Sequence, residues 1–243
     1  MTKNLRRTKI IATIGPASNS IECLTAMIEA GVDLVRVNFS HGDHLQQVQL
    51  IELARKASLK AKKEIGIIAD LQGPKIRVGK FEKAFIELKK DQMFILDCQQ
   101  QSLGNELSVS VDYQDLYQDV EPKCSLLLDD GLIELEVEHI DKQKIICKVI
   151  IGGRLSDNKG INKKGGGLSA KALTEKDLED LKQAIAANVD YIAVSFTRNA
   201  DDINFTKKRI KQAGGHAGVI AKIERAESLP LLDEIIRASD AVM

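Results

Sequence analysis

The chain has 243 residues, of which 44% are hydrophobic, so it is long enough to bury one large core or two smaller ones. Lysine and arginine together number 35, and aspartate and glutamate also number 35, which gives a formal net charge of zero. A neutral chain has no global field to attract nucleic acid or an anionic membrane, so any bound anion must be recognised by local groups.

Cysteine usage and hydropathy narrow the class of protein further. The four cysteines form no CxxC pair, which indicates neither a zinc site nor a disulfide framework. The basic start MTKNLRRTK leads at once into the strand-like run KIIATI rather than the apolar region of a signal peptide, and no run approaches transmembrane length. We therefore expect a cytoplasmic protein with reduced thiols and with neither a membrane nor a nucleic-acid partner.

Residues 9–71 alternate short apolar runs with longer amphipathic ones, which is typical of an α/β fold. Strands are expected at KIIAT, DLVRVNFS and EIGIIADL, with one helix at SIECLTAMIEAG and a second, polar helix that ends near Lys62. Ser20 is placed to cap the first helix, and Gly31 is placed to end it. The strands lack strict polar alternation, as expected for a parallel sheet covered on both faces.

The pattern changes in the segment 72–167, which holds short β-type runs and little that resembles a helix. The runs are AFIELKK, MFILDC, LSVSV, SLLLDDGLIELEVEHI and KIICKVII. We interpret this segment as an inserted small β-barrel domain. Gly165 to Gly167 close it without the GxxxxGK[ST] pattern of a phosphate loop, so we interpret them as a hinge. Thr174 and Asp177 then resemble a helix capping box.

Alternation of strands and helices resumes over 168–243. Strands are expected at DYIAVSF and GVIAKIE, helices over about 199–213 and 228–237, and a further strand from Asp240. Together with residues 1–71 this makes about five of the eight units of a (β/α)8 TIM barrel. The sequence therefore predicts a discontinuous barrel domain that is incomplete in this chain.

Polar side chains follow one face of the second expected strand. Residues two apart in a strand share a face, so Arg36, Asn38 and Ser40 point the same way. An unpaired charge is costly in a buried parallel strand, so Arg36 must meet either a ligand or an internal ion-pair partner. The local pattern leaves both interpretations open.

Two other strand ends carry charge. Lys222 and Glu224 share a face at the end of GVIAKIE, where they form either a structural salt bridge or part of a site. Asp70 ends the third strand, and Gly73 with Pro74 forces a turn directly after it. Active sites of (β/α)8 enzymes lie at the carboxyl ends of the strands, so these polar ends predict one common site.

Eight motifs occur in the order in which one enzyme family has them: TKIIATIGPAS, VRVNFSHG, ADLQGPKIR, LLDDGLIELEV, NKGIN, GGGLSAKALTEKD, DYIAVSF and AKIERAE. They resemble the motifs of the pyruvate kinase family and extend over essentially the whole chain. The GGGLSAKALTEKD stretch is similar to that of the bacterial type activated by AMP or sugar phosphates. The resemblance implies a phosphotransferase that converts phosphoenolpyruvate and ADP into pyruvate and ATP, the last step of glycolysis, with the inserted domain as a lid.

The resemblance also implies roles for single residues. Arg36 would contact the transferred phosphoryl group, and Lys222 would stabilise its charge and that of the enolate. Glu224 would hold Mg²⁺ or Mn²⁺. Asp130 of LLDDG has two interpretations, because it either faces the cleft under a closed lid or belongs to an ordinary hairpin turn.

Nucleotide contacts are implied for five residues that lie in four parts of the chain. A lone histidine is more often a surface or capping residue than a ligand, and only the surrounding SHG motif supports His41. The implied contacts are Pro16, Asn38, His41, Arg77 and Lys159.

A monovalent cation site is implied by the same resemblance. The family binds K⁺ at positions that correspond to Asn38, Ser40, Asp70 and the backbone carbonyl of Leu71, where many members have threonine. Many members also have an acidic residue where this chain has Lys75. The ammonium group of Lys75 could supply the positive charge internally, so we expect the enzyme not to require K⁺.

The resemblance further implies that the second acidic metal ligand, the effector domain for AMP or a sugar phosphate, and many contacts of a homotetramer follow residue 243. We therefore expect the chain to be inactive by itself. Two alternatives stay open. One is a non-catalytic fragment that serves as an interaction module. The other is a metal-dependent aldolase or lyase on pyruvate-like enolates, which would need neither an ADP site nor a large β lid.

Overall fold

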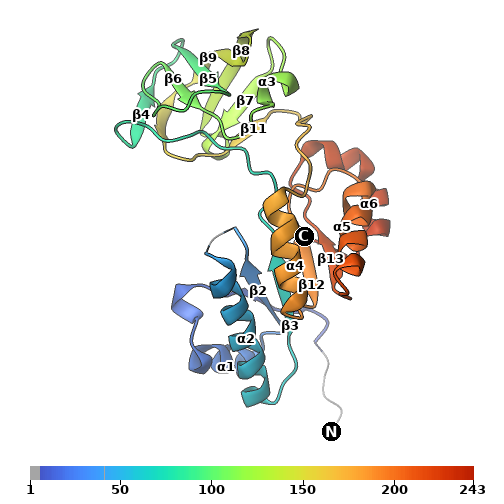
Figure 1. Ribbon diagram of the computed structural model, residues 1–243. Helices are drawn as coiled ribbons and strands as arrows, with labels where there is room; N and C mark the ends of the chain where they lie inside the picture. Colours follow the sequence, from blue (N-terminus) through green and yellow to red (C-terminus); the bar gives the residue numbers. More distant parts are fainter. Residues whose placement is uncertain (1–5, 41) are drawn as a thin grey trace. The chain divides into compact units, whose positions relative to one another are not determined.

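The computed structural model describes residues 6–40 and 42–243, and these form two compact units (Figure 1). The first unit contains the chain up to Pro74 and from Lys171 onward, and the second contains Lys75–Ala170. Within the described part of the chain, no helix is both long and apolar enough to cross a membrane.

The first unit is built on one parallel sheet. Each strand pairs with the strand that follows it in this unit, which is the arrangement that successive βα units produce. Arg36 is in register with Ile68, and Asn38 with Asp70, so the ends of neighbouring strands coincide. In spatial order the strands are β1 (Ile11–Thr13), β2 (Leu34–Asn38), β3 (Gly66–Asp70), β12 (Tyr191–Val194), β13 (Gly218–Ala221) and β14 (Ala241–Val242).

The helices of the first unit begin and end at the residues that the sequence marks. Ser20 Oγ accepts the Cys23 N–H at the start of α1, and the Gly31 N–H bonds back to the last turn of that helix. Thr174 and Asp177 form the predicted capping box at α4. The α-helices of this unit are α1 (Ile21–Ala30), α2 (His44–Ala61), α4 (Glu175–Ala186), α5 (Ala200–Gln212) and α6 (Leu232–Ala238), and a short 3₁₀ turn, η1, spans Pro16–Ser18.

The helix predicted over 228–237 differs in its first half. A 3₁₀ segment, η3 (Ala226–Leu231), comes first, and α6 starts only at Leu232. Pro230 lies inside η3 and explains the late start, because proline has no N–H to donate and its ring clashes with the preceding turn of an α-helix.

The two faces of the parallel sheet have different surroundings. Val35, Val37, Ile67, Val194 and their equivalents on β13 are buried in one core together with the apolar sides of the helices. Figure 1 shows α2 beside β2 and α5 beside β13, two pairs that are in contact. The opposite face has only a small apolar cluster around Ile68, which leaves room on that face for polar side chains near the carboxyl ends of the strands.

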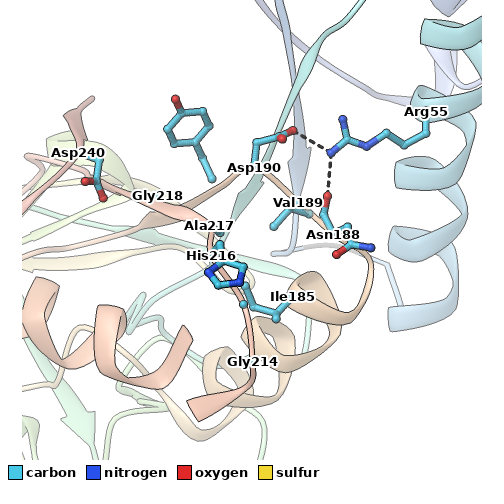
Figure 2. A pocket seen from close by; sticks show the side chains of 12 residues that line it. Arg55, Ile185, Asn188, Val189, Asp190, Gly214, His216, Ala217, Gly218 and Asp240 are labelled. Carbon is cyan, nitrogen blue, oxygen red and sulfur yellow. Dashed lines mark hydrogen bonds and ion pairs between the residues drawn. The ribbon is translucent and has the colours of Figure 1, made fainter. Parts of the chain in front are cut away.

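At the amino ends of the strands, three aspartates make the same kind of contact. Asp33, Asp190 and Asp240 each precede a strand, and each carboxylate accepts the N–H of a residue at the start of the neighbouring strand. Each also pairs with one cation: Arg6, Arg55 and Lys207, respectively. Figure 2 shows Arg55 directed at Asp190 beside a cavity of about 820 Å³ whose polar lining includes Asp240 and His216.

The second unit is mainly β-structure with two short helical segments, and it has its own core. The predicted β runs form β4 (Phe85–Leu88), β5 (Met93–Asp97), β6 (Ser108–Ser110), β7 (Ser125–Leu128), β8 (Ile133–Asp141) and β9 (Lys144–Ile151). The sequence did not indicate α3 (Leu116–Asp119), β10 (Gly153–Ser156) or β11 (Ile161–Lys163), which are too short to show a clear period. The sheets are ordered β11-β7-β8-β9-β5-β6 and β10-β4.

We expect the aspartates at the strand starts to make the protein sensitive to acid. The pKa values of the Asp33 and Asp240 carboxyls lie below 3.8, because each accepts a backbone N–H, from Ile10 and Val219, and has a cation nearby. A lowered folded-state pKa gives stability that is present above the ordinary value and is lost as the pH falls through the lower one. The urea concentration at the midpoint of unfolding should therefore decrease as the pH is lowered below about 4.

Circular dichroism between about pH 7 and about pH 3 tests this on the parent chain and on the Asp33→Asn/Asp240→Asn double variant. The double variant should lose less stability between these pH values, whereas Glu64→Gln, at an exposed position, should behave as the parent does. Equal losses in the double variant and the parent would show that other carboxyls carry the effect.

Candidate active site

The site begins with Asp70, the last residue of β3, which is 1% exposed. Its Oδ2 accepts the Arg36 Nε–H at 2.7 Å and also pairs with Arg36 Nη2. Lys222 Nζ lies 3.2 Å from Asp70 Oδ1 and 3.4 Å from Oδ2. The internal ion pair left open for Arg36 is therefore present, and it has two cations on one carboxylate.

Lys222 and Glu224 lie beyond the strand in which the sequence placed them. Strand β13 ends at Ala221, so both residues follow it, as Ser40 follows β2, although the Lys222 N–H still donates to the Val194 carbonyl at 3.0 Å. The predicted convergence of the two charges is nevertheless confirmed, since Lys222 Nζ lies 3.3 Å from Glu224 Oε1. Glu224 Oε2 accepts the backbone N–H of Phe196 at 3.0 Å, which fixes the carboxylate from a neighbouring loop.

Ser195 belongs to this cluster, although no role was predicted for it from the sequence. It follows β12 directly, its side chain is 2% exposed, and its Oγ donates to the Leu71 carbonyl at 2.7 Å. Lys222 Nζ donates to the same Oγ at 2.8 Å. The alternation that starts at Tyr191 and Ala193 continues to Ser195, so the face was readable from the sequence even though the partners were not.

The turn after Asp70 is held by close packing. Gly73 has φ +68°, and a Cβ at this position would lie 2.9 Å from Ser195 Cβ and 2.9 Å from Phe196 Cδ2. The Gly73 N–H donates to Asp177 Oδ1 at 3.0 Å, and Asp177 is fully buried at the start of α4. The backbone that carries Asp70 into the site is therefore tied to the capping box of α4.

The same helix holds the loop after β2. Asp180 is fully buried and contacts His44 Nε2 at 2.7 Å and Lys176 Nζ at 2.6 Å. Lys176 Nζ also donates to the carbonyl oxygen of Phe39 at 2.8 Å. Phe39 lies between Asn38 and Ser40, so the first turns of α4 position the backbone of both residues.

Two residues expected to contact the nucleotide line one cavity of the first unit. Pro16 of η1 and Asn38 at the end of β2 border a space of about 760 Å³ together with Thr13 and Gln46. Asn38 Oδ1 accepts the Ser40 N–H at 2.9 Å, which orients the amide. His41 lies outside the described residues.

The remaining predicted residues lie in the second unit. Arg77 Nη1 donates to the carbonyl of Asn158 at 2.9 Å, and Lys159 Nζ pairs with Asp129 Oδ1 at 2.7 Å. Arg77 and Lys159 come from adjacent segments, because the Lys159 carbonyl accepts the N–H of the residue that follows Arg77, Val78. Burial raises the pKa of the Asp112 carboxyl, which accepts the Arg77 N–H.

Asp130 and Lys75 have less specific surroundings. Asp130 has φ 55° in the turn between β7 and β8, where Asp129 and Gly131 are also left-handed, so the hairpin-turn interpretation describes its backbone. Lys75 is exposed, and its Cε lies 3.5 Å from the point where a Cβ on Gly160 would stand.

The comparison with known proteins assigns this architecture. Residues 5–243 match the family model described as "Pyruvate kinase, barrel domain". The chain belongs to the pyruvate kinase family. The family resemblance of the eight motifs is thereby confirmed.

Curated bacterial pyruvate kinases are similar over the full chain. The enzyme of Haemophilus influenzae is 46% identical over 247 aligned positions, which cover 100% of this chain and 52% of the relative. The pyruvate kinase of Buchnera aphidicola subsp. Schizaphis graminum is 47% identical with 51% of its length covered, and pyruvate kinase II of Salmonella typhimurium is 44% identical with 52% covered. The chain thus spans about half the length of the curated relatives it matches.

The donors at this site suit a hard cation only in part. Among the described residues no group of three or more histidine, cysteine, aspartate or glutamate side chains could hold a metal. Glu224 offers one carboxylate, and Asp70 Oδ1 accepts no hydrogen bond from the described part of the chain. Mg²⁺ is commonly held by one or two carboxylates together with substrate phosphates and water, so Glu224 fits such a shared site.

Replacing Gly73 by alanine should destabilise the first unit by about 2–4 kcal/mol, because the new Cβ adds a clash to an unfavourable φ. Gly214→Ala is the matched control, since Gly214 has φ +75° but open space around its Cβ position. Urea unfolding should show a much larger loss for Gly73→Ala. Equal losses would mean that the turn relaxes and that contact with Ser195 and Phe196 does not constrain it.

Proposed function

We propose that the complete protein containing residues 1–243 is a pyruvate kinase that transfers the phosphoryl group of phosphoenolpyruvate to ADP. The observation that carries this proposal is the convergence of Arg36, Asp70, Lys222 and Glu224 at adjoining strand ends of a chain that belongs to this family. We also propose that residues 1–71 and 168–243 are part of a (β/α)8 barrel, and that residues 72–167 are its inserted lid domain.

Arg36 and Lys222 supply the charge that phosphoryl transfer needs. The transferred group spreads negative charge over its oxygens, and stabilisation is greatest when cations are already in place. Asp70 holds both cations before any substrate binds, so little reorganisation is required when the phosphoryl group arrives. Lys222 then faces the enolate oxygen that forms as the phosphoryl group leaves.

The divalent cation, Mg²⁺ or Mn²⁺, would be held by Glu224 and would supply Lewis-acid stabilisation of the phosphoryl oxygens when bound. The hydrogen bond from the Phe196 N–H leaves Glu224 Oε1 as the oxygen that faces Lys222. Glu224 therefore keeps one oxygen directed at the reacting groups, and its orientation does not depend on the substrate.

For the nucleotide we propose contacts from Pro16 and Asn38 in the first unit and from Arg77 and Lys159 in the second, with His41 assigned by its motif alone. In this structure Lys159 pairs with Asp129, and Arg77 donates to the backbone carbonyl of Asn158. Phosphate oxygens of the nucleotide could replace both contacts.

Other properties of the complete protein are inferred from the family. We propose a cytoplasmic homotetramer of glycolysis, activated by AMP or a sugar phosphate at a site outside residues 1–243. Similarity to pyruvate kinases over the full chain favours the kinase over an aldolase or lyase. The alternative of a non-catalytic interaction module is decided by the assay below.

The complete protein should convert phosphoenolpyruvate and ADP in the presence of Mg²⁺, measured by coupling pyruvate to lactate dehydrogenase. Arg36→Met and Lys222→Met should each lower kcat by about 100-fold or more, because each removes a positioned charge from the transition state. Lys182→Met, at an exposed position of α4, is the matched control and should retain full activity. A folded complete protein without activity would sink the kinase assignment.

The enzyme should need no added K⁺. We propose that Lys75 supplies the positive charge that K⁺ contributes near Asn38, Ser40, Asp70 and Leu71 in other members. Activity should be equal in KCl and in choline chloride of the same ionic strength, and Lys75→Glu should create a dependence on K⁺ of about tenfold or more. Strong activation of the parent enzyme by K⁺ would contradict the proposal, and Lys80→Glu is the control for the change in charge.

A further inference from the structure

The shortest polar contact of Lys222 is with Ser195 rather than with a carboxylate. Lys222 Nζ lies 2.8 Å from Ser195 Oγ, against 3.2 Å or more from each oxygen of Asp70 and 3.3 Å from Glu224 Oε1. An ammonium group has three donors and no acceptor, so Ser195 must be the acceptor in this bond. The hydroxyl hydrogen is therefore free to point elsewhere.

That hydrogen has one well-placed acceptor. Ser195 Oγ lies 2.7 Å from the Leu71 carbonyl oxygen, and the two contacts together fix the hydroxyl with its hydrogen on Leu71 and a lone pair on Lys222. The side chain is buried, and Gly73 packs directly against its Cβ, so the rotamer has little freedom. A hydroxyl fixed in this way is a preorganised dipole aimed at a cation.

We propose that Ser195 is a positioning residue for Lys222 in the phosphoryl-transfer reaction, and this inference rests on the proposed function. Asp70 and Glu224 both attract the ammonium group, and each is also engaged elsewhere, Asp70 with Arg36 and Glu224 with the Phe196 N–H. Ser195 Oγ is a third acceptor for the Lys222 ammonium group. Three acceptors that belong to three separate segments restrain the ammonium group more closely than the two carboxylates alone would.

The role is selective for a small side chain with a hydroxyl. Alanine keeps the close approach to Gly73 but leaves the Leu71 carbonyl without this donor and Lys222 without its shortest acceptor. Threonine keeps the hydroxyl and adds one methyl group. The pair of variants therefore separates the hydroxyl from the packing.

The first measurement is the reactivity of Lys222 towards a trace of acetic anhydride, read by mass spectrometry relative to the exposed Lys60 in the complete protein. In Ser195→Ala the ratio should rise by about threefold or more, because Lys222 loses a hydrogen bond that restrains it. Ser195→Thr should restore most of the parent ratio. Thr197→Val removes another buried hydroxyl of the same loop, which donates to the Val194 carbonyl at 3.1 Å, and should leave the ratio unchanged.

The second measurement is turnover with phosphoenolpyruvate and ADP. Ser195→Ala should lower kcat by about 10- to 100-fold with little change in KM for ADP, and Ser195→Thr should recover most of the loss. An unchanged Lys222 labelling ratio in folded Ser195→Ala, or equal loss of kcat in Thr197→Val, would overturn the inference. A parent protein without turnover would overturn the proposed function instead, while the labelling result would still decide whether Ser195 positions Lys222.

Discussion

A buried carboxylate shared by two cations is the interaction on which the site depends. Asp70 is 1% exposed, and a carboxylate in such a position is stable only when it is paired and hydrogen-bonded. Arg36 comes from the neighbouring strand, and Lys222 comes from the loop after β13, which is separated from β3 by β12. The ion-pair cluster therefore requires the parallel order and the register of the sheet. Any slip by one residue would turn Asp70 or Arg36 to the opposite face, into the apolar core with the helices.

The loops around this carboxylate are fixed by a second buried set of charges at the start of α4. Asp177 holds the backbone of Gly73, and Asp180 with Lys176 holds the Phe39 carbonyl. Helix α4 is the first helix after the chain returns from the second unit, and it fixes loops that precede that unit in sequence. The Asp177 carboxylate therefore has two roles: it caps the start of α4, and it holds the turn after β3.

Much of this arrangement could be predicted from the sequence, and the limits have physical causes. Period-two patterns placed Arg36 and Asn38 on one face, and capping rules located the start and end of α1. Patterns do not say which residues become partners: Asp70 is 34 positions from Arg36 and 152 from Lys222, and only folding brings the three together. Ser195 was missed for the same reason, since a serine at a strand end has many roles until its neighbours are known. The end of the strand near Lys222 was also misjudged: β13 ends at Ala221, although the N–H groups of Lys222 and Ile223 still donate to backbone carbonyls and the side-chain pattern continues.

The two ends of the sheet show why charge alone does not identify a functional site. At the starting ends, Asp33, Asp190 and Asp240 each combine one backbone N–H with one cation, so each carboxylate is fully engaged. At the carboxyl ends, Asp70 takes two cations and no backbone N–H, and its Oδ1 accepts no hydrogen bond from the described residues. With Glu224 the charges of this cluster cancel, two positive against two negative. A phosphoryl anion bound here would add negative charge that the neutral cluster does not offset. Its binding is therefore stronger when a cation binds together with the substrate. The arrangement holds Arg36 and Lys222 in place, and a bound phosphoryl anion together with a cation would keep the site near neutrality, in keeping with the proposed phosphoryl transfer.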